Sequence, residues 1–490
     1  MPQVVCDSSL VLKLPMPNSE LSGKAQNPPQ PVTLPDNRDV PVGNIYLDFT
    51  LSSGLRGPAT GVIRTERRLT RYLLGRHAEG VRFIVWHHTN FRLVPENKVL
   101  AWSADPEDAP IPALTPSDEA QVKMAIPGNF SRTERQLGER LGLLVKRVDQ
   151  ATTVHLWRAG VRIWKLFFPP PLPPSHLDEL PICQIQPGDI YVNCAMILEK
   201  KRRVAVEKLR ARGVKVVIFA YDLIAVLHPE YYEPRLGGIL SDCFHRMIRL
   251  ADFIPCISRC TERDFQAFAR RKGCSISTGV VELGCDGVAT AAPEHGSHPV
   301  LTRLEEFNFV AMVGTFEIRK NHRLIIKLWE KLSAELGEKL PPLVIAGMRG
   351  WRVDGVIDEM RKLPIYGSKI FWLESLSDRQ VAWLFKHCAF SVYPSLYEGW
   401  GLPVAECLSF SRPVLCSNTS SLPEVAKGLA TLIDPRDPAA WERAVRSAIA
   451  EYVGRPVSIN YPRQTWEHAG RDIFDQILRM RSSNSPSARA

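Results

Sequence analysis

The sequence predicts an α/β protein made of two doubly wound domains. Apolar, strand-like runs alternate with helix-like segments over residues 41–287 and again over 301–462. This alternation favours parallel sheets that carry helices on both faces. The length agrees, since 490 residues exceed what a single core usually organises. A small, polar stretch at 288–300, interrupted by Pro, is predicted to link the domains.

The N-terminal elements follow in order along the chain. Residues 1–40 are rich in Pro, Ser, Asn and Gln and show no period, which predicts a disordered tail. A strand at 44–50, a Gly/Pro/Ser loop and a basic helix at 61–76 follow it. After a strand at 81–88, the alternation stops over 101–185, which predicts an insertion with a helix from Ser131 to about Phe168.

The alternation then resumes in both halves. Three more helices are expected in the first domain, near 198–212, 233–250 and 259–272, with apolar strands between them. In the second domain the helices are expected near 321–336, at 377–387 and from about 402. The strands expected there are NFVAMVG, PLVIAG, KIFWL, FSVYPS and RPVLCS.

Composition narrows the class of protein. The net charge of +10 favours anionic partners, and 45% hydrophobic residues allow a large core. The eleven cysteines include no CxxC pair, and the CxxxC pair of Cys256 and Cys260 has no second pair of metal ligands, so core packing in a reducing cytoplasm is expected. Neither a leader with a basic start and apolar core nor 18 apolar, uncharged residues in a row occurs, so neither secretion nor a membrane span is predicted.

The densest functional signal is SVYPSLYEGWGLPVAECLSFSRPVLCSNTSSLPEV at 391–425. A buried-type strand leads to Gly399 and Gly401, which let main-chain N–H groups approach a ligand, and then to a helix start. Glu398 lies before this turn and Glu406 lies eight residues later, so both carboxylates can face one pocket and accept hydrogen bonds from sugar or ribose hydroxyls. For an isolated pair of this kind, a purely structural arrangement, in which Glu398 caps the helix and Glu406 is a solvated acid of the first turn, is as common as a ligand-binding one.

Arg319 and Lys320 follow another strand end, in TFEIRKN. Two cations there can hold a diphosphate, although a solvated basic pair is the commoner structure for such residues.

These motifs resemble the retaining glycosyltransferases of family 4, whose GT-B fold sets two Rossmann-like domains face to face across a cleft. YEGWGLPVAE looks like the family's E-x7-E motif, and the similarity covers about 305–440. The resemblance implies that Glu398 lies beside the transferred sugar, Glu406 binds the ribose and Lys320 stabilises the leaving diphosphate with Arg319. It places further donor contacts at these positions: Gly61, Gly314, Thr315, Gly399, Trp400, Gly401 and Leu402. It also implies that a C-terminal helix at 463–481 crosses back to the first domain.

The chain departs from the family pattern at two positions. Thr315 stands where many members carry an Arg, so Arg319 is expected to supply the second positive charge. Tyr221 stands where an H-D-x-x-P-like segment has its His, so no general base is carried over to it. Asp222, Arg64 and Ser258 are the predicted acceptor-side residues, and His228 is interpreted as structural.

The expected activity is transfer of a sugar, with retention of configuration, from a nucleotide donor to a glycan or lipid-linked glycan. Assembly of a bacterial surface polysaccharide is the process that the resemblance implies. No DxD sequence occurs, so protein cations are expected to replace a metal ion, and no metal or cofactor is predicted. The sequence does not choose between GDP, UDP and dTDP donors.

Alternatives remain at three points. TTVHLWRAGVRIWKLFFPPPLPP at 152–174 interleaves aromatic and basic residues, which suits either the anionic inner face of the cytoplasmic membrane or packing within the first domain. A catalytically inactive nucleotide-sugar-binding or scaffold protein on the same fold is the alternative function. Nucleic-acid binding is suggested by charge alone, without a motif, and is not expected.

Overall fold

The structure is a computed structural model, and it describes residues 43–53, 61–76, 80–103, 177–289, 294, 298–374 and 376–482. The predicted tail, most of the insertion and the segment at 152–174 lie outside these residues, as does the larger part of the predicted linker. The described residues of both halves belong to one compact unit, so contacts between the halves are part of that unit.

The N-terminal half contains a five-stranded sheet in the order β3-β2-β1-β4-β5. Its strands are parallel except β3, which pairs with β2 as an antiparallel hairpin. Next to β5, isolated parallel bridges from Val217 to Phe253 and from Ala220 to Cys256 connect this sheet to a parallel pair of strands, β6 and β7. The strands are β1 (Ile45–Asp48), β2 (Val81–His87), β3 (Asn90–Leu93), β4 (Ile190–Asn193), β5 (Lys215–Ile218), β6 (Ile254–Cys256) and β7 (Thr278–Val280).

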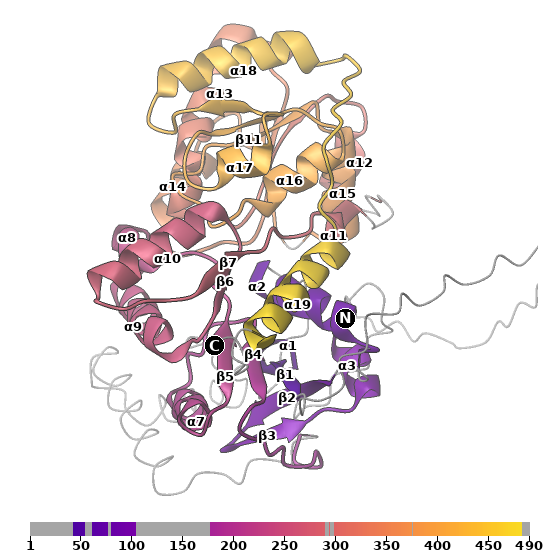
Figure 1. Ribbon diagram of the computed structural model, residues 1–490. Helices are drawn as coiled ribbons and strands as arrows, with labels where there is room; N and C mark the ends of the chain where they lie inside the picture. The colour runs from indigo at the N-terminus through magenta and orange to yellow at the C-terminus, as the bar shows by residue number, and fades with distance from the viewer. Residues whose placement is uncertain are drawn as a thin grey trace, which may run out of the picture. The chain divides into compact units, whose positions relative to one another are not determined.

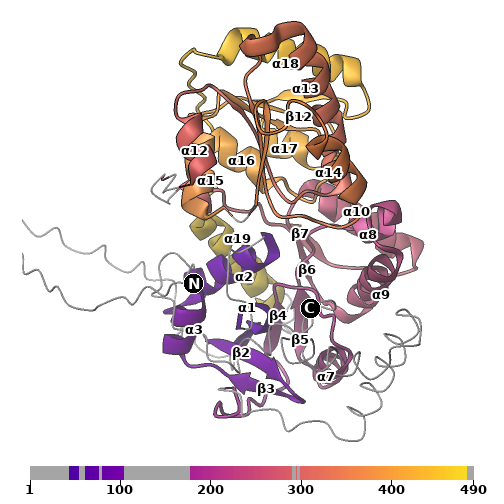
Figure 2. The same ribbon diagram turned by 180° about the vertical axis from the view of Figure 1, so that it is seen from behind.

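Helices cover both faces of this sheet because successive strand residues point to opposite sides. Ile45 and Leu47 pack with α2 and α3, whereas Tyr46 packs with α7, α9 and α10 on the other face. Figures 1 and 2 show α2 and α3 on one side of the sheet and α7 on the opposite side. The helices are α1 (Thr50–Ser53), α2 (Gly61–Leu73), α3 (Glu96–Ser103), α7 (Lys200–Ala211), α8 (Ile224–Leu227), α9 (Pro234–Leu250), α10 (Arg259–Arg271) and α11 (Asp286–Ala289).

The C-terminal half contains a six-stranded parallel sheet in the order β10-β9-β8-β11-β12-β13. Numbered within this half, the order is 3-2-1-4-5-6, that of a doubly wound nucleotide-binding fold. The strand order reverses between β8 and β11, the position where such sheets bind ligands. The strands are β8 (Val310–Val313), β9 (Leu343–Ala346), β10 (Ile370–Leu373), β11 (Phe390–Tyr393), β12 (Val414–Ser417) and β13 (Thr431–Ile433).

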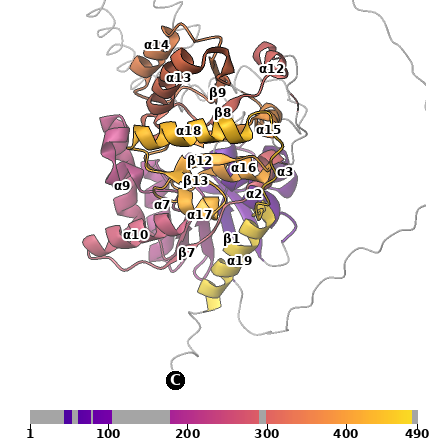
Figure 3. The same ribbon diagram turned by 90° about the horizontal axis from the view of Figure 1, so that it is seen from above.

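Helices also cover both faces of the second sheet. Core residues of α13, α14 and α18 pack on one face, and those of α15, α16 and α17 pack on the other. Figure 3 shows α18 between α13 and strand β13, and it contacts both. The helices are α12 (Pro299–Leu304), α13 (His322–Leu336), α14 (Asp354–Arg361), α15 (Asp378–His387), α16 (Leu402–Ser409), α17 (Leu422–Ala426), α18 (Pro438–Tyr452) and α19 (Trp466–Ser482).

The C-terminal helix α19 packs against α2 of the N-terminal half (Figure 1). The contact at Gly470 is so close that an added Cβ would lie 2.4 Å from the Tyr72 ring. Trp466 donates its main-chain N–H to Asp286, and buried Ile473 and Phe474 join a core cluster with residues of both halves. The last helix of the chain therefore ties the second half to the first.

The expected strands and helices that lie within the described residues are confirmed, with bounds shifted by a few residues. The hairpin strand β3 was not predicted, because the four residues NFRL are too few to establish a period. Within the described part of the chain, no helix combines the length and apolar character needed to cross a bilayer.

Candidate active site

The site begins where β8 ends. Gly314 has a φ of +143° and precedes a loop that closes in a single 3-10 turn, Ile318–Lys320. Asn321 then adopts the left-handed conformation (φ 58°) and α13 starts. Lys320 lies beside Gly314, since its Nζ would be in ordinary van der Waals contact, at 3.5 Å, with a Cβ added there. This turn carries both predicted cations to the carboxyl edge of the sheet.

The second part of the site follows β11. The turn from Glu398 to Gly401 is held by the segment after β12: Glu398 donates its N–H to Ser420, and the Ser421 hydroxyl donates to main-chain carbonyls of the turn. Gly401 has a φ of +110°, a conformation that glycine adopts without a steric penalty, and it caps the start of α16. Ser420 and Ser421 therefore hold the turn that presents Glu398.

Glu398 and the two predicted cations form one buried cluster. Arg319 Nη1 lies 2.5 Å from Glu398 Oε2, and Lys320 Nζ lies 2.6 Å from Oε1. Glu317 pairs with the opposite side of Arg319 at 2.9 Å. Burial opposes ionisation of Glu398, but Arg319 and Lys320 outweigh it and lower the pKa of this carboxyl to about 2. Glu398 is therefore a carboxylate at neutral pH, held in place by two cations.

Glu406 lies one turn into α16 and meets a side chain of the other half. Arg64, on the first turn of α2, pairs with Glu406 Oε1 at 2.7 Å and with Asp378 at 2.9 Å. Burial raises the pKa of Glu406, and Arg64 offsets part of this rise. Arg64 was predicted on the acceptor side, and the structure places it against the predicted ribose-binding carboxylate.

The two halves also lie close together at Gly399. An added Cβ there would lie 2.0 Å from the main-chain oxygen of Tyr221 and 3.0 Å from Cβ of Asp222. The Thr261 hydroxyl approaches the carbonyls of Tyr221 and Gly399 at 3.3 Å each. Asp222, whose pKa burial raises, thus lies beside the turn that carries Glu398.

Other predicted residues have mainly structural contacts. The Tyr221 hydroxyl donates to the carbonyl of Cys194 at 2.5 Å, so it is directed into the first half. Ser258 is fully buried and caps α10 by accepting from Thr261 N–H. His228 packs against the Tyr397 ring, in line with its interpretation as structural.

The remaining predicted donor residues surround the turns. Trp400 is buried below the start of α16, and Leu402 packs against the shared core. An added Cβ at Gly61 would lie 4.0 Å from Leu402, so the start of α2 meets the start of α16. Thr315 lies beside Gly350, in the loop that follows β9.

Sequence reasoning missed two buried acids of the first half. Asp48, at the end of β1, accepts hydrogen bonds from the Arg202 guanidinium and the Tyr191 hydroxyl. Glu66, on α2, accepts from the N–H of Ser52 at 2.6 Å, and burial raises its pKa to about 7. Asp48 is the last residue of an otherwise apolar strand, which is a signal that sequence analysis can use. Glu66 has no such signal, because it resembles the other charged residues of its helix.

Comparisons with known proteins identify a glycosyl transferase domain and similar chains. Residues 297–464 match the family model for glycosyl transferases group 1. The serotype-specific mannosyltransferase WbdA of Escherichia coli is 26% identical over 284 residues, which are 56% of this chain and 34% of that protein. The O-antigen chain mannosyltransferase B of Escherichia coli is 28% identical over 225 residues, which are 46% and 58% of the two chains.

A solved structure extends the comparison to both halves. Sucrose-phosphate synthase from Thermosynechococcus elongatus superposes with a TM-score of 0.52 at 15% identity, over 90% of this chain and all of that one. The chain therefore has the GT-B fold. It carries a group 1 glycosyl transferase domain, and it spans about one third to three fifths of the curated mannosyltransferases named above.

Proposed function

We propose that the chain is a retaining glycosyltransferase that moves a sugar from a nucleotide donor to a glycan or lipid-linked glycan acceptor. The observation that carries the proposal is Glu398, fixed between Arg319 and Lys320 at the point where the strand order of the second sheet reverses. Ligands of doubly wound sheets bind at this point. A carboxylate beside two cations suits a sugar whose diphosphate leaves with negative charge.

The parts of the donor are assigned to different residues. Lys320 and Arg319 stabilise the departing diphosphate, together with N–H groups at the start of α16. Glu406 accepts hydrogen bonds from the ribose hydroxyls, and Arg64 holds this carboxylate in place. Asp222 faces the turn from the first half and is assigned to the acceptor side. Transfer requires no metal ion in this scheme, because protein cations carry the compensating charge.

The relatives narrow the substrate. Two of the similar proteins are mannosyltransferases, one of them an O-antigen chain enzyme, so we assign a mannosyl nucleotide as donor and a bacterial surface polysaccharide as the product. Retention of configuration is adopted from the similarity of YEGWGLPVAE to family 4. We place the reaction in the cytoplasm, at the inner face of the membrane where a lipid-linked acceptor would be reached.

A thermal-shift screen against GDP, UDP, dTDP and their sugar conjugates tests the donor site, followed by a transfer assay with the nucleotide that binds. A ligand that binds only the folded protein raises its melting temperature. We expect a selective shift that is reduced in Lys320→Ala and Glu406→Ala, and turnover at least about 100-fold lower in Glu398→Gln. Glu467→Gln, an exposed change on α19, is the matched control. Full turnover in Glu398→Gln would refute the assignment.

The alternative function is a binding or scaffold protein that keeps the donor site without chemistry. Two residues support this alternative. Tyr221 stands where the family pattern has a His and directs its hydroxyl into the first half, and Thr315 stands where many members carry an Arg and has no charge. A selective nucleotide shift without transfer to mannan or lipid-linked acceptors would favour it.

A further inference from the structure

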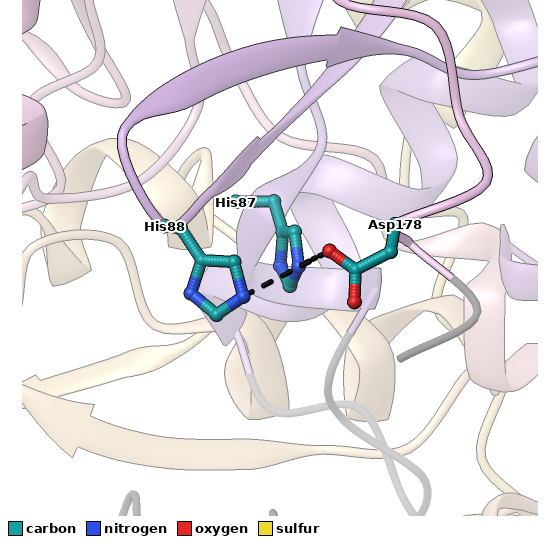
Figure 4. Close-up of side chains that lie close together, drawn as sticks. All are labelled: His87, His88 and Asp178. Carbon is teal, nitrogen blue, oxygen red and sulfur yellow. Dashed lines mark hydrogen bonds and ion pairs between the residues drawn. The ribbon is translucent and has the colours of Figure 1, made fainter. Parts of the chain in front are cut away.

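A cluster of two histidines and an aspartate lies on the edge hairpin of the N-terminal sheet. His87 ends β2, and His88 is the first residue of the two-residue turn into β3. Asp178 comes from a distant part of the sequence. It is brought to the hairpin by main-chain hydrogen bonds from Leu93 to Pro181 and from Cys183 to Phe91. We propose that His87, His88 and Asp178 form a binding site for Zn²⁺ (Figure 4).

The backbone directs both histidines to the same side. Neighbouring residues of a strand normally point to opposite faces. His88 escapes this rule because its φ is +54°, in the left-handed region that His, like Asn and Asp, adopts more often than most residues other than Gly. The two rings consequently lie side by side, with centroids 3.9 Å apart and their planes tilted by 49°, and both present Nε2 to Asp178 (Figure 4).

The distances suit a small divalent ion. Oδ1 of Asp178 lies 2.9 Å from His87 Nε2 and 3.9 Å from His88 Nε2, and the three ligand atoms lie within 4.8 Å of one another. Bonds of ~2.1 Å in a tetrahedral zinc site separate ligand atoms by about 3.4 Å, between these two values. Small side-chain rotations therefore bring all three atoms to bonding distance.

The ligand types favour zinc over the hard cations. Two imidazoles and one carboxylate match Zn²⁺, whereas Mg²⁺ and Ca²⁺ prefer oxygen ligands. His88 is half exposed and Asp178 is 39% exposed, which leaves a route for the ion and a fourth position for water. His87 is only 11% exposed and fixes the inner side of the site.

Arg92 limits the affinity and also fixes the geometry. Its guanidinium lies 3.9 Å from Asp178 Oδ1, and this positive charge opposes a bound cation. The same guanidinium donates to the carbonyls of Asp178 and Leu180 at 2.9 and 2.6 Å, so it holds the Asp178 turn against the hairpin. We assign the ion a structural role, as a clip between the hairpin and the segment that follows residue 176.

Zinc titration of the full chain without a polyhistidine tag tests the proposal. Metal-free protein is titrated by calorimetry, and Co²⁺ is used as a spectroscopic substitute. We expect one saturable site, weakened at least about tenfold in His88→Asn and in Asp178→Asn. Asn is chosen at 88 because it tolerates a positive φ. His468→Asn, at an exposed histidine of α19, is the matched control and keeps the wild-type affinity.

Melting curves verify that each variant is folded before its affinity is compared. Cys183→Ser separates the site from binding by a partly exposed thiol nearby. The proposal is overturned by absence of saturable binding, or by binding that survives in both His88→Asn and Asp178→Asn. It is equally overturned if Cys183→Ser abolishes binding or the Co²⁺ complex shows thiolate charge transfer.

Discussion

The ion pair between Arg64 and Glu406 is expected to be one of the strongest polar links between the two halves. The perturbation is a double-mutant cycle of Arg64→Met, Glu406→Gln and the combined variant. Only 13% of the Arg64 side chain and 5% of the Glu406 side chain are exposed, so water screens this pair weakly. Met and Gln keep much of the side-chain volume while removing the charges.

The magnitude follows from burial and distance. Two charges about 4 Å apart attract by about 4 kcal/mol at an effective dielectric constant of ~20, and breaking a buried pair by removing one partner costs about 3–5 kcal/mol. Asp378, which is 26% exposed, also pairs with Arg64 and retains part of the attraction when Glu406 is changed. We therefore expect a coupling free energy of about 2–4 kcal/mol at pH 8.

Thermal and urea unfolding of the four proteins measure the coupling. Burial already raises the pKa of Glu406 above 4.5, and loss of Arg64 raises it further. The cost of Arg64→Met should therefore shrink as the pH falls, because a protonated carboxyl needs no cation. The exposed pair of Arg471 and Glu467 provides a control cycle, expected below about 0.5 kcal/mol. Additive effects of Arg64→Met and Glu406→Gln would refute the reasoning.

Three further predictions concern other parts of the molecule. Glu66→Gln should flatten the pH dependence of the melting temperature. The pKa of the Glu66 carboxyl in the folded protein is raised from 4.5 to about 7, so the stability of the wild type falls by about 3 kcal/mol as the pH rises through this window. Equal slopes of melting temperature against pH in the wild type and the variant would contradict this prediction. Gly399→Ala should abolish transfer, because its Cβ meets the Tyr221 carbonyl, whereas Gly355→Ala, with open space around it, should not. EDTA should leave the initial rate of transfer unchanged in His88→Asn, which lacks the proposed zinc site, and loss of turnover in this variant would disprove metal-independent transfer.

Much of the fold and the turns of the candidate site were predictable because their signals are local. Buried strands alternate with amphipathic helices, and glycines stand in the loops that follow β8 and β11. The positions of Lys320 and Glu398 therefore followed from this pattern together with the family resemblance. The hairpin strand β3 escaped because four residues are too few to show a period. The capping role of Ser258 was available in principle, since Ser is a favoured N-cap residue.

Pairings between distant residues could not be predicted from a single sequence. Arg64 and Glu406 are 342 positions apart, and Arg202 and Asp48 are 154 apart. Nothing in either neighbourhood identifies the partner, because charged residues of helices are usually solvated. The direction of the Tyr221 hydroxyl depends on where the Cys194 carbonyl lies, and this is set by the packing of β4 against β5.

The charges around Glu398 show how the site can accept a donor. Arg319 and Lys320 balance Glu317 and Glu398, so a diphosphate that enters this group must loosen an existing pair. The guanidinium group of Arg319 has little freedom to move, because it contacts the carboxylates of Glu317 and Glu398 and the main-chain carbonyl of Tyr397. Lys320 makes one ion pair through a flexible stem. We infer that Lys320 turns to contact the diphosphate, whereas Arg319 keeps Glu398 in place and stabilises the departing diphosphate through its nearby positive charge.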